Sequence, residues 1–255
     1  MCLILFAYKS HPDYRLILAA NRDEFLNRPT APLGFHFPGE KILCGLDLQA
    51  GGTWLAVSGA GRIAGITNYR DPARNKFDAP SRGDIVLDYL RSGRSAKEFL
   101  AESMPNRHIY NGFNLLLIDL QSCWYSSNAG QDDKELIPGV YGLSNRFLDT
   151  PWPKLVRGKE LLLKALREGA DPESILRLLG DDFQPPEELL PDTGVGLAWE
   201  KTLAPIRIHS PTYGTRSSAV ILVGYDQSVQ FVEQTWEHGE GIQAGEREDI
   251  QMMLS

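Results

Sequence analysis

The sequence predicts an α+β fold in which two antiparallel β-sheets pack together and helices flank them. Apolar runs occur in pairs separated by short polar turns, which is typical of β-hairpins. Helical patterns come in groups between the hairpins and do not alternate with single strands, which argues against a doubly wound parallel sheet. The chain contains no GxGxxG or P-loop pattern, so no nucleotide-binding unit is indicated.

The first hairpin is the clearest element. Residues 2–8 are apolar at nearly every position, as in strands that are buried on both faces. Pro12 and its polar neighbours predict a turn, and residues 14–20 form the partner strand. The polar run 21–24 follows this strand directly. The Pro-rich stretch 27–39 is predicted to be a loop.

The later elements follow the same alternation of hairpins and helices. Hairpins are expected over 54–58 with 62–67, over 114–120 with 122–127, and over 217–223 with 229–236. A helix is expected over 81–91, and a second one is expected to begin after the capping box at Ser95. Two more are expected over 154–168 and 172–179. Residues 181–195 are interpreted as a polar excursion. The C-terminal tail is predicted to be weakly ordered or a short helix.

Length and composition indicate one domain that spans residues 1–255. The apolar fraction of 42% is ordinary for a globular protein. The 26 basic and 33 acidic residues give a net charge of −7, which argues against nucleic acid or an anionic membrane as a partner. No segment approaches the ~20 apolar residues of a membrane span. The first residues lack the basic start of a secretory signal.

Three cysteines, at positions 2, 44 and 123, are too few and too scattered for a disulfide framework. This usage predicts a reducing, cytoplasmic location. The histidines show no metal-ligand spacing with the cysteines, so neither a metal site nor a cofactor is expected. The oligomeric state is left open.

Cys2 is the best candidate for a reactive residue. A small side chain after the initiator Met generally permits removal of Met1, which would leave a thiol and a free α-amine on one residue. The α-amine has an ordinary pKa of about 7.7–8.0, which suits a general base. A thiol beside such a base is an activated nucleophile. The alternative is that Cys2 is simply a small apolar residue in a buried strand.

Six dispersed motifs give the chain a family resemblance: MC at 1–2, NRDE at 21–24, GGTW at 51–54, GITNYR at 65–70, GLSN at 142–145 and GTRSS at 214–218. In this order they resemble the NRDE family, whose animal members are called transport and Golgi organisation protein 2. That family is similar to N-terminal-nucleophile (Ntn) hydrolases of the choloylglycine hydrolase and penicillin V acylase type. The resemblance implies an αββα four-layer sandwich with a cleft at the end of the first strand.

The resemblance also implies roles for particular residues. Cys2 matches the nucleophile of those hydrolases, and Arg22 and Asp23 match the Arg and acid that orient it. The hydrolases separate these two by two residues, so Asn21 and Glu24, which have that spacing, remain an alternative pair. Asn68 and Asn145 match amides that stabilise an oxyanion. A late arginine is matched by Arg216.

The expected function is therefore hydrolysis of an amide or acyl bond in a small, partly apolar substrate. Trp54 and Tyr69, together with Asn21 and Glu24, are candidates for substrate contacts, although packing is the simpler interpretation of the aromatic rings. Each polar motif alone could be a turn or a surface ion pair. The rival hypothesis is a non-catalytic haem, lipid or acyl-CoA binding and trafficking protein, with haem as a ligand of the Cys2 thiolate.

Overall fold

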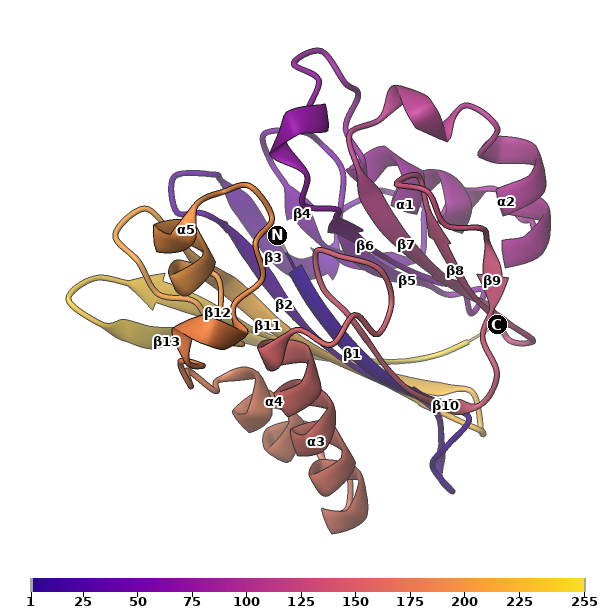
Figure 1. Cartoon of the computed structure of the whole chain (residues 1–255). Helices are drawn as coiled ribbons and strands as arrows, with labels where there is room; N and C mark the ends of the chain where they lie inside the picture. Colours follow the sequence, from indigo (N-terminus) through magenta and orange to yellow (C-terminus); the bar gives the residue numbers. More distant parts are fainter. Residues whose placement is uncertain (1, 255) are drawn as a thin grey trace.

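The computed structural model describes residues 2–254, and its strands form two antiparallel sheets (Figure 1). The strands of the first sheet, in spatial order, are β10 (Gly139–Leu143), β1 (Cys2–Tyr8), β2 (Tyr14–Phe25), β11 (Tyr213–Gly224), β12 (Ser228–His238) and β13 (Ile242–Met253). The strands of the second are β3 (Thr30–Phe35), β4 (Ile42–Asp47), β5 (Leu55–Ser58), β6 (Ile63–Asn68), β7 (Phe113–Ile118), β8 (Cys123–Ser127) and β9 (Lys134–Glu135).

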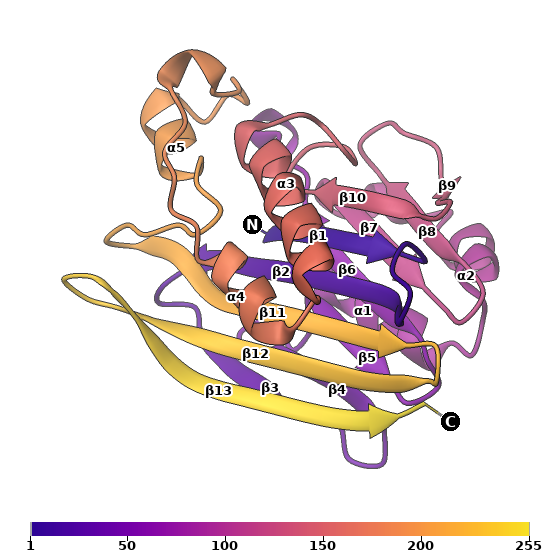
Figure 2. The ribbon, with the colours of Figure 1, turned by 90° about the horizontal axis from the view of Figure 1, so that it is seen from below.

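Helices cover the outer face of each sheet. On the first sheet lie α3 (Pro153–Glu168) and α4 (Pro172–Leu179), which cross its central strands in Figure 2. On the second lie α1 (Gly83–Arg91) and α2 (Ala96–Ser103), the latter with the expected capping box at Ser95. The short helix α5 (Leu197–Thr202) follows α4, and 3₁₀ turns occupy 72–74, 107–109 and 187–189. This arrangement is the expected αββα sandwich.

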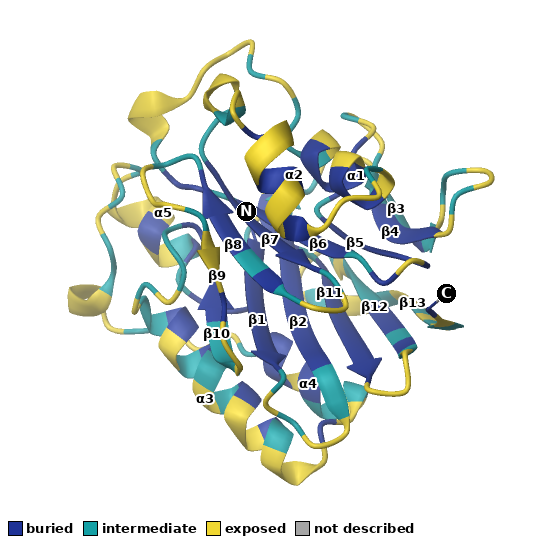
Figure 3. Ribbon diagram, turned by 90° about the vertical axis from the view of Figure 1, so that its right-hand side faces the viewer, coloured by how far each residue is buried: buried dark blue, intermediate teal, exposed yellow. Residues whose placement is uncertain are grey.

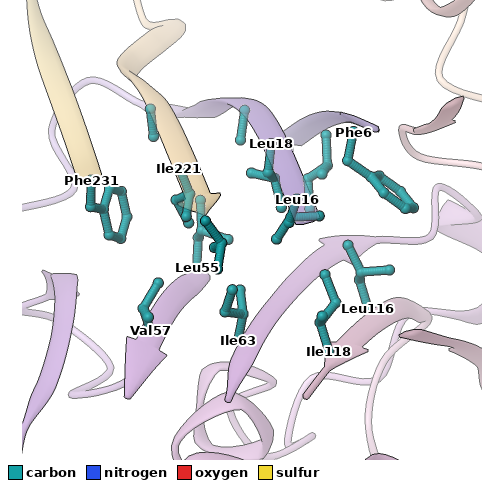
Figure 4. Packing of buried hydrophobic residues seen from close by; sticks show 14 of the residues in the cluster. Phe6, Leu16, Leu18, Leu55, Val57, Ile63, Leu116, Ile118, Ile221 and Phe231 are labelled. Carbon is teal, nitrogen blue, oxygen red and sulfur yellow. The ribbon is translucent and has the colours of Figure 1, made fainter. Parts of the chain in front are cut away.

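Three apolar clusters hold the layers together. One fills the space between the sheets, into which Phe6 and Ile221 point from the first sheet and Leu116 from the second (Figure 4). The other two lie under the helix pairs, so the central strands are buried while the helices keep exposed outer faces (Figure 3). In β1, Ile4 faces the inter-sheet cluster and Leu5 faces α3, which explains the unbroken apolar run.

Three of the sequence predictions differ from the structure. Strand β2 continues through residues 21–25, because β11 pairs with it there and the polar side chains are satisfied within the fold. The stretch 27–39 is not all loop: β3 forms there as an edge strand, where Pro32 needs no ladder partner. The C-terminal tail is neither weakly ordered nor helical, because β13 pairs with β12 as an edge strand.

Pairing in the first sheet sets the position of the candidate nucleophile. Cys2 is the first residue of β1 and lies opposite Arg22 of β2. Residues directly opposite in an antiparallel pair share a face, so both lie on the side that faces the second sheet. Across residues 2–254, no helix has the length and apolar character that crossing a membrane requires.

Candidate active site

A cavity of about 320 Å³ lies at the start of β1, between the ends of the two sheets. Six of the residues singled out from the sequence line it, namely Cys2, Arg22, Asp23, Glu24, Trp54 and Asn68. They come from four strands or strand-flanking loops that are far apart in the sequence. The other cysteines, Cys44 and Cys123, are buried elsewhere and do not line it.

The thiol of Cys2, the candidate nucleophile, is protonated at neutral pH. Burial raises its pKa above the ordinary value, and the nearby Asp23 carboxylate acts in the same direction. Arg22 lowers the pKa, but burial outweighs its effect. The thiol therefore needs a base before it can attack. No histidine is among the described residues that line the cavity.

Arg22 is held by residues other than its neighbour in sequence. Its guanidinium lies 4.4 Å from the centre of the Trp54 ring and donates to the Thr30 hydroxyl at 3.0 Å. Its carboxylate partner is Asp47, at 3.5 Å. Asp23 follows Arg22 in β2 and points to the opposite face, because successive strand residues alternate between faces. Trp54 is thus both a wall of the cavity and a platform for Arg22.

Asp23 faces the other way, into a buried polar layer. Its Oδ1 accepts a 2.8 Å hydrogen bond from Thr215, and its backbone oxygen accepts one of 2.8 Å from Tyr213. Burial raises the pKa of Asp23, while the Lys154 ammonium opposes that shift. Burial in turn lowers the pKa of Lys154 to about 8. Lys154 and Tyr213 were not found from the sequence, although Thr215 lies in the GTRSS motif.

The alternative pair, Asn21 and Glu24, is divided between two faces. The Asn21 amide donates 2.9 Å hydrogen bonds to the carbonyls of Leu179 and Ile206, on the side of α4 and away from the cavity. Glu24 lines the cavity and lies 3.9 Å from Arg28. The geometry therefore brings Arg22, Asp23 and Glu24 to the cavity and leaves Asn21 as a fully buried structural amide.

The two candidate oxyanion amides are adjacent but differ in orientation. Asn68 lines the cavity at the end of β6. Asn145 is fully buried, is not among the lining residues, and donates a 2.8 Å hydrogen bond to the Asn68 carbonyl. Arg70 donates to the Asn145 side chain at 3.4 Å and forms a buried ion pair with Glu200 at 2.8 Å. Asn145 thus positions the backbone that carries Asn68.

Two other candidates lie outside the cavity. Arg216 donates to the carbonyls of Phe25, Leu26 and Arg28, and so holds the loop that follows β2. Tyr69 packs on Phe147 and lines a second cavity of about 520 Å³. Asn68 lines both cavities, so the second adjoins the first.

Two lining arginines were missed by sequence reasoning. Arg28 forms a 2.7 Å ion pair with Asp47, and Arg82 directly precedes α1. Both lie in loops, where no strand or helix period marks the side chain that turns inward. The GGTW motif was the available signal: a Cβ on Gly52 would lie 2.8 Å from the carbonyl carbon of Gly83. Glycine at this position lets the start of α1 approach the cavity.

The site offers a thiol, a neighbouring amide and several guanidinium groups around one cavity, which are the parts that acyl transfer requires. Within the described part of the chain, no three His, Cys, Asp or Glu side chains are placed to hold a metal ion.

The chain is similar to proteins of one family over most of its length. The family model described as Transport and Golgi organisation 2 matches residues 1–238. The Transport and Golgi organization protein 2 homolog of Bos taurus is 38% identical over 261 residues, covering 92% of this chain and 93% of that protein. Transport and Golgi organization protein 2 of Drosophila melanogaster is 29% identical over 265 residues, covering 92% of each.

One solved structure extends the comparison to the fold. A mutant conjugated bile acid hydrolase from Clostridium perfringens superposes with a TM-score of 0.51 at 9% identity, covering 98% of this chain and 96% of the other. At this identity the likeness concerns architecture alone. The expected Ntn-hydrolase-like sandwich is thereby confirmed.

Proposed function

The chain belongs to the Transport and Golgi organisation 2 family, and from that premise we propose that it is an acyl hydrolase whose nucleophile is the Cys2 thiol. The observation that carries the proposal is the placement of this thiol. Of the three cysteines, Cys2 lines the cavity, beside Asn68 and opposite Arg22. A cysteine kept only for packing would not need amide and guanidinium neighbours.

The reaction would proceed in two steps. The Cys2 Sγ attacks the carbonyl carbon of an amide or thioester, and the bond to the leaving amine or thiol breaks, which leaves a thioester on Sγ. Water then attacks this thioester, releases the carboxylic acid and restores the thiol. The proton of the thiol passes to the leaving group in the first step, and a proton from water returns to sulfur in the second.

The base in this proposal is the α-amine of Cys2 itself, exposed by removal of Met1. An amine with an ordinary pKa of about 7.7–8.0 takes a thiol proton readily near neutral pH. Because the pKa of the Cys2 thiol is raised, an internal base is required and not merely helpful. Asn68 supports the oxyanion, Asn145 positions Asn68, and Arg22 and Asp23 orient the terminal residue.

The rival hypothesis is a binding protein for haem, lipid or acyl-CoA that reuses the same cleft. A haem iron bonded to Cys2 needs a thiolate. Burial favours the protonated thiol at this position, which weighs against simple ligation. A haem titration in which no Soret shift depends on Cys2 is the result expected from the hydrolase proposal.

The test uses chromogenic acyl esters and N-acyl aminocoumarins of graded chain length. Cys2→Ala is expected to lower turnover by at least about 1,000-fold, because the attacking atom is lost. Cys44→Ala is the matched control, since it removes a buried thiol that does not line the cavity. Equal turnover by Cys2→Ala and wild type would disprove the proposal. Thermal unfolding of each variant checks that the fold is intact.

A further inference from the structure

We propose that the Cys2 cavity takes acyl compounds that carry a carboxylate or phosphate-type group, and that Arg82 binds this anionic group. The inference rests on the proposed function and narrows its substrate class. It concerns a residue for which the family motifs provide no role. Arg82 belongs to none of the six motifs and lies between the last residues of a loop and the first turn of α1.

The guanidinium of Arg82 has donors to spare. Among the described residues its hydrogen-bond partner is the Gly112 carbonyl, at 3.0 Å from Nη1, and it enters no salt bridge. A guanidinium has five N–H donors in a fixed planar fork. Nε and Nη2 therefore remain for a ligand, and a carboxylate or phosphate can engage such a fork through two parallel hydrogen bonds.

Three guanidinium groups line the cavity, and they outnumber the two carboxylates at its rim, Glu24 and Asp47. Arg22 and Arg28 both lie against Asp47, and Arg28 also lies 3.9 Å from Glu24. Asp23 is buried, with Lys154 as its leading electrostatic partner. Glu24 also acts on Arg82, so two rim carboxylates are shared among three guanidinium groups. Because burial disfavours an uncompensated cation, an anionic ligand would relieve a cost already present in the protein alone.

The position of Arg82 also fits a substrate with two parts. Arg82 lines both the Cys2 cavity and the second cavity of about 520 Å³. The second cavity is partly apolar, with Tyr69, Pro72, Phe77 and Val195 in its wall. An acyl chain in this cavity would bring its carbonyl toward Cys2 while an anionic leaving group stays within reach of Arg82. The start of α1, of which Gly83 also lines the Cys2 cavity, adds a favourable dipole for negative charge.

The experiment compares three probes that differ in one group: N-octanoylglycine, the corresponding aminomethylphosphonate, and neutral N-octanoylglycinamide. Binding is measured by calorimetry with the full chain carrying Cys2→Ala, so that no turnover intervenes. We expect at least one anionic probe to bind about tenfold or more tightly than the glycinamide. The carboxylate and phosphonate arms show which anion is preferred.

Substitutions assign the preference to Arg82. In the Cys2→Ala background, Arg82→Gln is expected to abolish the preference for anionic probes over the glycinamide. Arg82→Lys is expected to retain part of this preference. Arg94→Gln makes the same change in net charge beyond the opposite end of α1 and should retain it in full. Retention by Arg82→Lys rules out misfolding as the cause of a loss.

The outcomes separate the two proposals. Equal binding of all three probes, no binding of any, or a preference that survives Arg82→Gln would overturn the anion site. Anion-selective binding without hydrolysis by the wild-type protein would support this site and refute the acyl hydrolase. Hydrolysis that depends on Cys2 but is equally fast with and without the anionic group would support the acyl hydrolase and refute the anion site.

Discussion

Two arginine–carboxylate pairs of nearly equal length lie in different parts of the molecule, one in the buried polar layer and one at the rim of the Cys2 cavity. Arg70 and Glu200 lie 2.8 Å apart with side chains only 5% and 3% exposed, whereas Arg28 and Asp47 lie 2.7 Å apart with 29% and 14% exposed. The first pair belongs to the buried layer that positions Asn145 and Asn68. The second belongs to the rim. Ion pairs of equal length can therefore contribute differently to stability, because the strength of an ion pair depends on how far its charges are removed from water.

The largest effect is expected in the buried pair. Arg70→Met should lower the free energy of unfolding by about 3–5 kcal/mol, because Glu200 is left as a buried charge without its partner. The double variant Arg70→Met with Glu200→Leu should recover a substantial part of this loss. Urea denaturation measures both. A single substitution that costs less than about 1 kcal/mol would show that the pair does not organise this layer.

A smaller effect is expected at Thr215, whose hydroxyl donates to Asp23 and accepts from the Ile208 backbone. Thr215→Val keeps the shape but removes both bonds, and should cost about 1–3 kcal/mol. Thr235→Val is the control, since its hydroxyl bond to the Glu246 carbonyl is exposed. If the two variants are equally stable by thermal unfolding, the buried layer does not depend on this hydroxyl.

The rim pair should matter still less for stability. Arg28→Gln is expected to lower the free energy of unfolding by less than about 1 kcal/mol, because water compensates partly exposed charges. Its stability should also depend less on salt than that of the wild-type protein. A loss as large as that of Arg70→Met, measured in the same urea titrations, would remove the distinction between the rim and the buried layer.

Near neutral pH, the raised pKa of Cys2 should have no effect on stability, because the thiol is protonated in both folded and unfolded chains. The effect lies in reactivity at alkaline pH. Alkylation by iodoacetamide requires the thiolate, so its rate at Cys2 should still be rising above the pH of about 8.5 where an unfolded cysteine is half ionised. Peptide mapping separates Cys2 from Cys44 and Cys123. A rate that levels off below pH 8 would contradict a raised pKa.

The same contrast between regions explains what the sequence could reveal. The hairpin of β1 and β2 was predictable because an unbroken apolar run is typical of a strand that is buried on both faces. The NRDE run was identified as part of the site, but not as strand, since its burial depends on pairing with β11 and on a hydrogen bond that Asn21 donates to α4. The edge strand β13 was missed because an edge can be charged and still pair.

Some of the site residues could likewise be predicted from the sequence motifs, and others could not. Cys2, Arg22, Asp23, Glu24, Trp54 and Asn68 line the cavity as the motifs indicated. The orientation of Asn145 was not predictable, since its partner is a backbone carbonyl that carries no sequence signal. Arg82 was not predictable either, because the approach of α1 to the strand after Gly52 is a tertiary contact.

The most direct test of the account is a trapped acyl-enzyme. The wild-type protein is mixed with an octanoyl thioester, quenched in acid within seconds and analysed by intact mass and peptide mapping. We expect a chain without Met1 that carries one octanoyl group on Cys2, and a rate of trapping that matches turnover. A chain that retains Met1, or an acyl group on Cys44, Cys123 or a lysine instead, would contradict the central claim.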